Sequence, residues 1–232
     1  MTKIFTSIAP KNFDRQKPAI NSWIRLGFDV YSVNTSDYEI DYVQQVFPDV
    51  KTILKRPIIR GKFYVEINHI LDEIFKTGET CWIINSDIIL NITQSEIEEI
   101  NDLAKYTLVF GSRIDIDYDD SKEVYKYGFD YFILNNNLNH LFTSRTEFCM
   151  GQTWWDYWMP ITCIRKRVTP IYYQKDIAIH HKHEQNWTQE SNEYYAAHLA
   201  KEIGMKNFNR ASLEQFTKQC WEIINEGSKS YS

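Results

Sequence analysis

Residues 81–90 read CWIINSDIIL: an apolar run, the polar tripeptide Asn-Ser-Asp, and a second apolar run. The first run predicts a buried β-strand, because β-branched and aromatic residues follow one another without a polar break. Asp87 therefore lies between two buried segments. An ionised carboxylate in that position needs a cation, hydrogen-bond donors or open solvent. The stretch places a candidate functional carboxylate at the end of a core strand.

The tripeptide Asn85-Ser86-Asp87 has two interpretations. Oxygen ligands of this kind suit a divalent cation, which would in turn bind phosphate oxygens. The same residue types are common in turns, where their side chains hydrogen-bond the backbone. Taken alone, the tripeptide favours the turn, so residues elsewhere in the chain are needed to distinguish a metal site from a turn.

Composition limits the class of protein. The chain has 232 residues, of which 43% are hydrophobic and 25% charged, which is typical of a globular domain with a substantial core. The net charge of -5 argues against a surface coated by nucleic acid, although it allows a local basic patch. No run is apolar enough to cross a bilayer, and the start lacks a signal-peptide pattern. The 4 cysteines lie far apart without CxxC spacing, which favours a reducing compartment. We expect a cytoplasmic protein.

Strand and helix patterns alternate through about the first 110 residues, which predicts a mainly parallel α/β sheet covered by helices on both faces. The expected strands are residues 3–8, 28–33, 50–54 and 81–84, and the expected helices begin at Pro18, at Gly61 and at Gln94. Thr93 and Glu96 have capping-box spacing before the last of these helices.

The second half of the chain has shorter elements. Its expected strands are residues 108–116, 131–134 and 171–179, and its expected helices are 191–202 and 212–225. Residues 154–158 are expected to form a short helix or a turn, and residues 228–232 are expected to fray. We divide a single domain into a half over 1–110, a half over 111–190 and C-terminal helices over 191–232.

Several polar residues follow expected parallel strands. In open α/β sheets, ligands bind beyond the carboxyl ends of the strands. Thr6, Ser7, Asn34 and the tripeptide Asn85–Asp87 should therefore line one crevice, although they are far apart in sequence. Their shared position at strand ends is stronger evidence for a binding crevice than any single motif.

Arg60-Gly61-Lys62 precedes an expected helix, whose free N–H groups and two adjacent cations would attract an anion such as a diphosphate. The alternative is a solvated basic turn. His180, His181 and His183 cluster after the last expected strand, and imidazole is a common ligand of divalent metals. The alternative is surface polarity with one hydrogen bond to the core.

Residues 148–160, FCMGQTWWDYWMP, surround Asp156 with aromatic side chains. Partial desolvation raises the pKa of a carboxyl group and makes it a better base near neutral pH. The alternative is an aromatic core in which Asp156 caps a helix. Arg113, Asp115 and Asp117 alternate in GSRIDID and so should face one side of a strand.

These segments together resemble the glycosyltransferases of the GT-A fold. The resemblance rests on KIFTSI, KPAINSWIRLG, RGKFYVEINHIL, WIINSDIIL, FGSRIDID, the Trp-rich segment and HHKHEQNW, and so extends over most of the chain. It implies a mostly parallel sheet with flanking helices and a smaller antiparallel part on the acceptor side. Such enzymes commonly use a DxD motif that holds Mn²⁺ or Mg²⁺ against a nucleotide-sugar.

The resemblance also implies roles for individual residues. Asn85-Ser86-Asp87 would be a modified DxD motif, with Asn85 at the donor sugar or ribose and Asp87 as the metal ligand. His180 best matches the C-terminal metal ligand, while strand alternation leaves His181 open. Asp156 matches the base of an inverting enzyme. The nucleotide would lie beside Thr6 and Ser7, with the Arg60 and Lys62 cations at its phosphates.

The implied activity is glycosyl transfer from a nucleotide-sugar, with UDP-sugar favoured, to an acceptor hydroxyl. The acceptor would be a saccharide, a protein or the hydroxymethylated DNA base of a phage, in which case the protein would work in the host cytoplasm. For DNA, the basic segments 51–62 and 165–167 would be the contact surfaces, and otherwise they are solvated faces. The alternatives are a nucleotidyltransferase and a catalytically idle nucleotide-sugar-binding module.

Overall fold

The computed structural model describes residues 1–56, 64–119, 121–125, 127–184, 187–205, 208–209 and 212–232. The strands are β1 (Lys3–Thr6), β2 (Asp29–Asn34), β3 (Lys51–Leu54), β4 (Cys81–Ile84), β5 (Ile89–Leu90), β6 (Val109–Gly111), β7 (Ile114–Ile116), β8 (Lys122–Val124), β9 (Tyr131–Leu134), β10 (Ile171–Tyr173), β11 (Ala178–His181) and β12 (Lys229–Tyr231). The helices are α1 (Phe13–Arg25), α2 (Asp37–Val46), α3 (Ile67–Thr77), α4 (Gln94–Ala104), α5 (Trp155–Arg165), α6 (Gln189–Glu202) and α7 (Leu213–Gly227), with a 3-10 helix over Asn136–Leu141.

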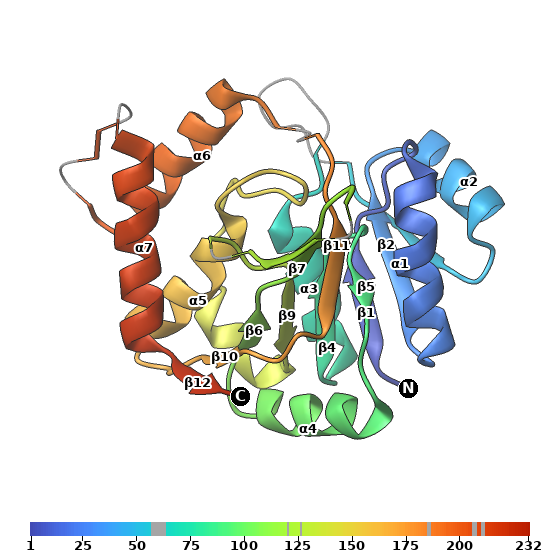
Figure 1. The fold of residues 1–232 in the computed structure, drawn as a ribbon, viewed down its shortest axis with the longest axis horizontal. Coiled ribbons are helices and arrows are strands. Elements are labelled where there is room, and N and C mark those ends of the chain that lie inside the picture. The colour runs from blue at the N-terminus through green and yellow to red at the C-terminus, as the bar shows by residue number, and fades with distance from the viewer. Residues whose placement is uncertain (57–63, 120, 126, 185–186, 206–207, 210–211) are drawn as a thin grey trace.

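The strands form a large and a small sheet (Figure 1). The large sheet has the order β12-β10-β6-β9-β4-β1-β2-β3, and its neighbours are parallel except that β9 runs antiparallel to β4 and β6. The small sheet has the order β5-β11-β7-β8 and is mixed, because β7 and β11 pair in parallel while its other pairs are antiparallel. The predicted α/β class with a mostly parallel central sheet is confirmed.

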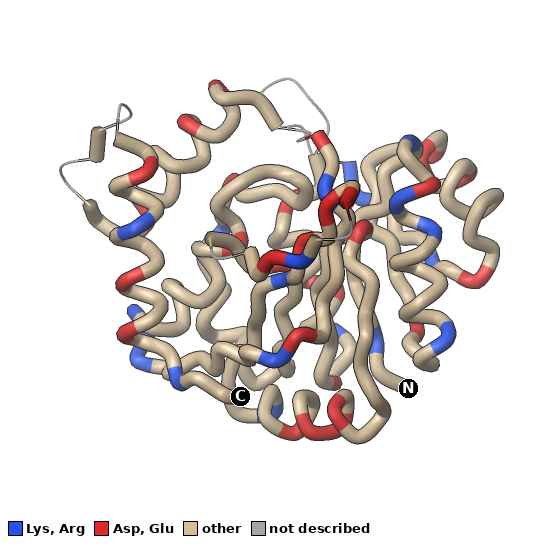
Figure 2. The backbone as a smooth tube through the Cα atoms, in the orientation of Figure 1, with Lys and Arg blue, Asp and Glu red and all other residues tan. Residues whose placement is uncertain are grey.

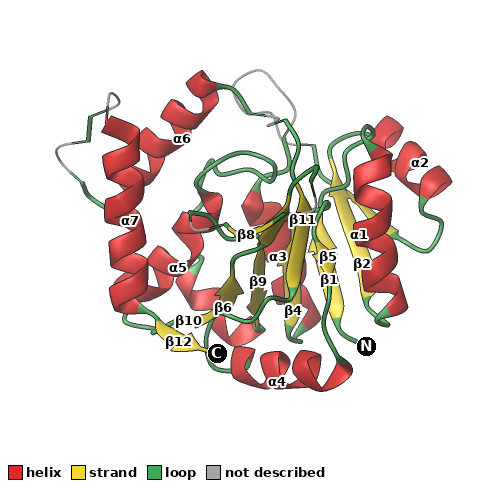
Figure 3. Ribbon diagram, viewed as in Figure 1, coloured by secondary structure: helices red, strands yellow, loops and turns green. Residues whose placement is uncertain are grey.

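Helices cover both faces of the large sheet (Figure 3). Successive side chains of strand β4 point to opposite faces of the sheet and so pack against different helices. Trp82 and Ile84 pack with residues of α1 and α4, whereas Cys81 and Ile83 pack with residues of α3, α5, α6 and α7. Burial on both faces explains why this strand reads as a continuous apolar run.

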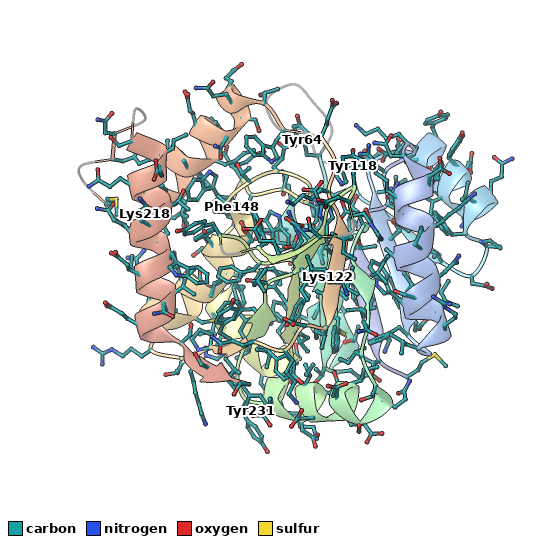
Figure 4. All side chains as sticks on the ribbon, in the orientation of Figure 1. Tyr64, Tyr118, Lys122, Phe148, Lys218 and Tyr231 are labelled. Carbon is teal, nitrogen blue, oxygen red and sulfur yellow. The ribbon has the colours of Figure 1, made fainter. Side chains whose placement is uncertain are left out.

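Side chains fill the spaces between these layers (Figure 4). Phe148 is fully buried, while Tyr118 is 90% exposed at the edge of the molecule. The four cysteines are all buried and unpaired. Across the part of the chain that is described, no helix has the length and apolarity needed to span a membrane.

The predicted start of the first helix at Pro18 is wrong, since α1 begins five residues earlier at Phe13. The Gln16 side chain causes the difference: its amide donates to the carbonyl oxygens of Ala9 and Lys11 and so holds the preceding loop against the first turn. Pro18 then lies inside the helix, where it removes one backbone donor.

The predicted helix start at Gly61 is also wrong, because α3 begins at Ile67. The preceding residues are extended against the segment before α5: Met150 N donates to Val65 O, and Ile67 N donates to Phe148 O. The buried face of α3 is formed by Ile67, Ile70, Leu71 and Ile74, whose side chains are all in the core.

Each of two expected strands is divided between the sheets. Residues 108–116 form β6 in the large sheet and β7 in the small one, and residues 171–179 likewise contribute to β10 and β11. The expected fraying of residues 228–232 is wrong. Strand β12 extends the large sheet, with Lys229 N bonded to Pro170 O and the Tyr231 hydroxyl bonded to Glu99.

The topology gathers polar side chains at the carboxyl edge of the large sheet, which is the side where its parallel strands end. Parallel strands β1, β2 and β4 all end there, after Thr6, Asn34 and Ile84. Because β9 is antiparallel and Ile84 pairs with Tyr131, residues that precede β9 reach the same edge. The small sheet begins close by, since Asp87 immediately precedes the Ile88-β5 segment.

Replacing Gly111 by alanine is expected to destabilise the protein. An added Cβ atom would lie 1.9 Å from the hydroxyl oxygen of Tyr131, which is fully buried and donates to the Tyr173 carbonyl. Because overpacking typically costs about 1–3 kcal/mol, the free energy of unfolding in urea should fall by that amount. Lys122→Ala, on the exposed strand β8, is the control. Equal stability of both variants and the wild type would contradict this account.

Candidate metal and catalytic site

The Asp87 carboxylate meets two imidazoles at the edge of the large sheet. Asp87 Oδ2 lies 3.1 Å from His183 Nε2 and 3.8 Å from His180 Nε2. One ligand atom from each of the three residues lies within 4.8 Å of the others. His181, which strand alternation left open as a ligand, is exposed and has no place in this cluster.

Strand pairing brings residues that are about 95 positions apart into this contact. Strand β5, directly after Asp87, pairs antiparallel with β11, so Ile89 lies opposite Ile179. His180 is the next residue of β11 and faces inward. The chain leaves the strand after His181, which returns the His183 ring to within 4.8 Å of the His180 ring. Strand alternation could not predict this return, because it holds only while the chain remains extended.

The charges of this cluster stabilise one another. Burial by itself would raise the pKa of Asp87, but the hydrogen bond from His183 and the charges of His180 and Arg113 outweigh burial, so the pKa lies below its ordinary value. The same hydrogen bond raises the pKa of His183. Asp87 is therefore ionised at neutral pH and is available as an oxygen ligand.

A buried charge network lies behind His180. Asp115 Oδ1 is 2.8 Å from His180 Nδ1 and accepts a hydrogen bond from Arg113 Nε at 2.7 Å. Arg113 also donates to Asp130 Oδ1, and so does the Asn85 amide. One chain of contacts thus joins Asn85 of the tripeptide to the imidazole of His180. Both Asp115 and Asp130 are in the core, where Arg113 offsets their charges.

The chemistry of this donor set fits a divalent metal. Two imidazole nitrogens and one carboxylate oxygen form a common partial coordination shell, which leaves positions for other oxygen ligands. The Asp87 side chain remains 29% exposed, so a ligand can approach it from solvent. Imidazole nitrogens favour Mn²⁺ over Mg²⁺, which prefers oxygen.

Asp156 lies in the first turn of α5, close to this network. Its Oδ2 accepts a hydrogen bond from Phe129 N, one residue before Asp130. Burial, together with the charge of Asp130, raises the pKa of Asp156 to about 7. The Tyr125 ring packs closely on Gly128 beside this carboxylate, since a Cβ atom on Gly128 would lie 2.4 Å from Tyr125 Cε1 and 3.5 Å from Asp156 Oδ2. A carboxyl group with this pKa can take a proton near neutral pH.

The other sequence-predicted residues have different surroundings. Thr6 is fully buried and its hydroxyl has no hydrogen-bond partner among the described residues. Ser7 is partly exposed, and Ser86 lies in the turn between β4 and β5. Asn34 does not line an open crevice, because its buried amide donates to Ile8 O. The predicted anion-binding residues Arg60 and Lys62 lie outside the described residues.

Sequence reasoning missed Asp130 and did not identify His183 as the second imidazole beside Asp87. Asp130 directly precedes the apolar run of β9, which is the same kind of signal that marked Asp87 after β4. The antiparallel direction of β9 puts the start of that run at the site. A mostly parallel sheet with a smaller antiparallel part was expected, with no direction given for residues 131–134, and the start of a parallel strand would lie at the opposite edge.

The basic segments have partners of their own. Lys51, Lys55 and Arg56 form ion pairs with Asp29, Glu73 and Asp37, respectively. Arg165 hydrogen-bonds the carbonyl oxygen of Glu202. Figure 2 shows basic and acidic segments interspersed over the molecule. These pairings do not favour a DNA-binding surface.

No protein-family model matches the sequence, and no curated protein matches it. The mannosyltransferase PcManGT of Pyrobaculum calidifontis, in complex with GDP-Man and Mn²⁺, has a similar fold, with a TM-score of 0.54 and 11% identity over 97% of this chain and 73% of that chain. A protein described as a nucleotide-diphospho-sugar transferase of Desulfovibrio desulfuricans G20 has a TM-score of 0.49 and 12% identity, with 100% of both chains covered. The inositol-1-phosphate CTP transferase of T. maritima has a TM-score of 0.49 and 13% identity, over 90% of this chain and 98% of that chain.

The similarity to the mannosyltransferase shows the fold. The shared fold is a mixed α/β one with a large, mostly parallel sheet and flanking helices, and the match extends over 97% of this chain.

Replacing Asp156 by asparagine should stabilise the protein more at pH 8 than at pH 4. An unfolded aspartate ionises near pH 4, whereas the native carboxyl group holds its proton up to about pH 7. Stability therefore falls as the pH rises from about 4 to 7, and the asparagine variant lacks this loss. We expect a gain of about 1–2 kcal/mol in urea denaturation at pH 8, reduced by partial solvent screening. An equal difference at both pH values would contradict the raised pKa.

Proposed function

We propose that this protein is a metal-dependent glycosyltransferase that moves a sugar from a nucleotide-diphosphate donor to an acceptor hydroxyl. The observation that carries the proposal is the meeting of Asp87 with His180 and His183 at the carboxyl edge of the sheet. The fold shared with a mannosyltransferase supports it. In this proposal residues 1–110 bind the nucleotide-sugar, and residues 111–190 provide the acceptor side and the histidines.

Asp87, His180 and His183 would hold Mn²⁺ or Mg²⁺. When bound, such an ion offsets the negative charge that develops on the leaving diphosphate. Lys62 and Arg60 would add positive charge near the phosphates, and Thr6 and Ser7 would contact the nucleotide.

The Asn85 amide has a defined orientation in this scheme. Its Nδ2 donates to Asp130 Oδ1, and its amide oxygen accepts no hydrogen bond from the described residues. That oxygen would bind a hydroxyl group of the donor sugar or ribose. The replacement of the first acid of a DxD motif is thus compatible with donor binding, while Asp87 alone supplies the carboxylate ligand.

Asp156 would act as the base of an inverting transfer. The acceptor hydroxyl loses its proton to the Asp156 carboxylate as its oxygen forms a bond to the anomeric carbon. The bond from that carbon to the diphosphate oxygen breaks, and the nucleoside diphosphate leaves. A pKa of about 7 keeps Asp156 both ionised in a useful fraction and basic enough to accept the proton.

UDP-sugar is the favoured donor, and the acceptor is a saccharide, a protein or a hydroxymethylated DNA base. The ion-paired lysines and arginines of residues 51–56 give DNA no preference over the others. A nucleotidyltransferase is the rival activity for the same crevice. It would release pyrophosphate from a nucleoside triphosphate and a sugar phosphate, so this assay separates the two.

We expect Mn²⁺-dependent turnover of a UDP- or GDP-sugar to be lost in Asp87→Ala. Removal of the only carboxylate in the cluster should reduce transfer, or donor hydrolysis without acceptor, by at least about 100-fold. The wild type should prefer Mn²⁺ to Mg²⁺, because two of its ligands are imidazoles. His181→Ala, which changes an exposed imidazole next to His180, is the matched control. Wild-type turnover by Asp87→Ala would remove the basis of the proposal.

Activity should rise with pH and reach half of its maximum near pH 7, as Asp156 ionises. Asp156→Ala should lose about 10²- to 10⁴-fold in kcat, since a positioned general base typically contributes that much. Initial rates from pH 5.5 to 9 measure the profile, and NMR of the product reports the anomer. Retention of configuration, or a flat profile in the wild type, would contradict the role of Asp156 as the base.

A further inference from the structure

A carboxylate contacts the imidazole of His180 on the side of the ring that faces away from Asp87. Strands β7 and β11 pair in parallel with His180 directly opposite Asp115, and both side chains are 8% exposed. Asp115 Oδ1 lies 2.8 Å from His180 Nδ1. On the other side of the ring, His180 Nε2 lies 3.8 Å from Asp87 Oδ2.

This contact determines which ring nitrogen carries the proton. Asp115 Oδ1 already accepts from Arg113 Nε, and an ionised carboxylate can only accept hydrogen bonds. His180 Nδ1 must therefore be the protonated nitrogen. The lone pair of Nε2 is then directed at the space shared with Asp87 and His183, which is the geometry that a metal ligand needs.

We propose that Asp115 is a positioning residue that orients His180 and fixes its tautomer, so that the metal site is preformed before a nucleotide binds. This inference rests on the proposed metal site of Asp87, His180 and His183. Carboxylates behind ligating histidines commonly have this role, and their loss typically weakens metal binding about 10- to 100-fold.

An ion pair with Arg113 holds the Asp115 carboxylate in position. Arg113 Nε lies 2.7 Å from Asp115 Oδ1, and Arg113 Nη1 lies 2.8 Å from Asp130 Oδ1. The Tyr125 ring stacks on the guanidinium, with Arg113 Cζ 4.2 Å from the ring centroid. Asp130 in turn holds the Asn85 amide. The imidazole of His180 and the amide of Asn85 are therefore oriented by one shared cation, although they come from different sheets.

The test is Mn²⁺ binding to the full chain without nucleotide, with free Mn²⁺ measured by EPR. We compare the wild type with Asp115→Ala, which removes the acceptor, and with Asp115→Asn, which keeps the shape and one acceptor oxygen. Asp117→Asn is the matched control: it makes the same change two residues along, where the carboxylate is partly exposed and bonded to Lys182. The imidazole ¹⁵N NMR spectrum of each protein reports which nitrogen of His180 carries the proton.

We expect the dissociation constant for Mn²⁺ to rise about 10- to 100-fold in Asp115→Ala, less in Asp115→Asn, and not at all in Asp117→Asn. In Asp115→Ala the tautomer with the proton on Nε2 should become populated. Unchanged affinity in both Asp115 variants, or weaker binding without a change of tautomer, would overturn the positioning role and leave the proposed function standing. Failure of the wild type to bind Mn²⁺ would overturn the metal site, and this role with it.

Discussion

The guanidinium of Arg113 binds two buried carboxylates, those of Asp115 and Asp130, beside the candidate site. Removing one partner of a buried ion pair typically costs about 3–5 kcal/mol, since the remaining charge is left without compensation. Burial by itself would lower the pKa of Arg113, but the two carboxylates outweigh it and raise that pKa. The orientation of His180 and of Asn85 depends on this arrangement, and so does the shape of the candidate site.

The same contacts join the two sheets. Asp130 precedes a strand of the large sheet, whereas Asp115 and His180 belong to paired strands of the small one. Strand β8 is exposed throughout, whereas Leu90 of β5 and Ala178 of β11 are buried in the core with residues of α1 and α4. The polar network adds to these apolar contacts, and the short strand β5 follows Asp87 directly.

Two carboxyl groups of the candidate site have pKa values shifted in opposite directions. Asp87 is held ionised by the imidazoles, and Asp156 is kept partly protonated by burial and by the charge of Asp130. Such a separation is what allows one carboxylate to serve as a ligand and another as a base at the same pH. The Phe129–Asp130 dipeptide links them, because its backbone and side chain contact Asp156 and the charge network, respectively.

Apolar runs in the sequence were sufficient to predict strands β1 to β4 and β9, the layers and the carboxylate Asp87 at a strand end, because burial on both faces leaves an uninterrupted apolar pattern. They did not predict strand β12 or the division of residues 108–116 and 171–179 between two sheets. Capping boxes and buried stripes likewise act within a few residues of the chain. Only the tertiary structure decided that β9 runs antiparallel and so brings Asp130 to the site, and that His183 turns back toward Asp87. Strand direction and side-chain convergence are set by pairing between segments that are distant in sequence, and no local pattern records that pairing.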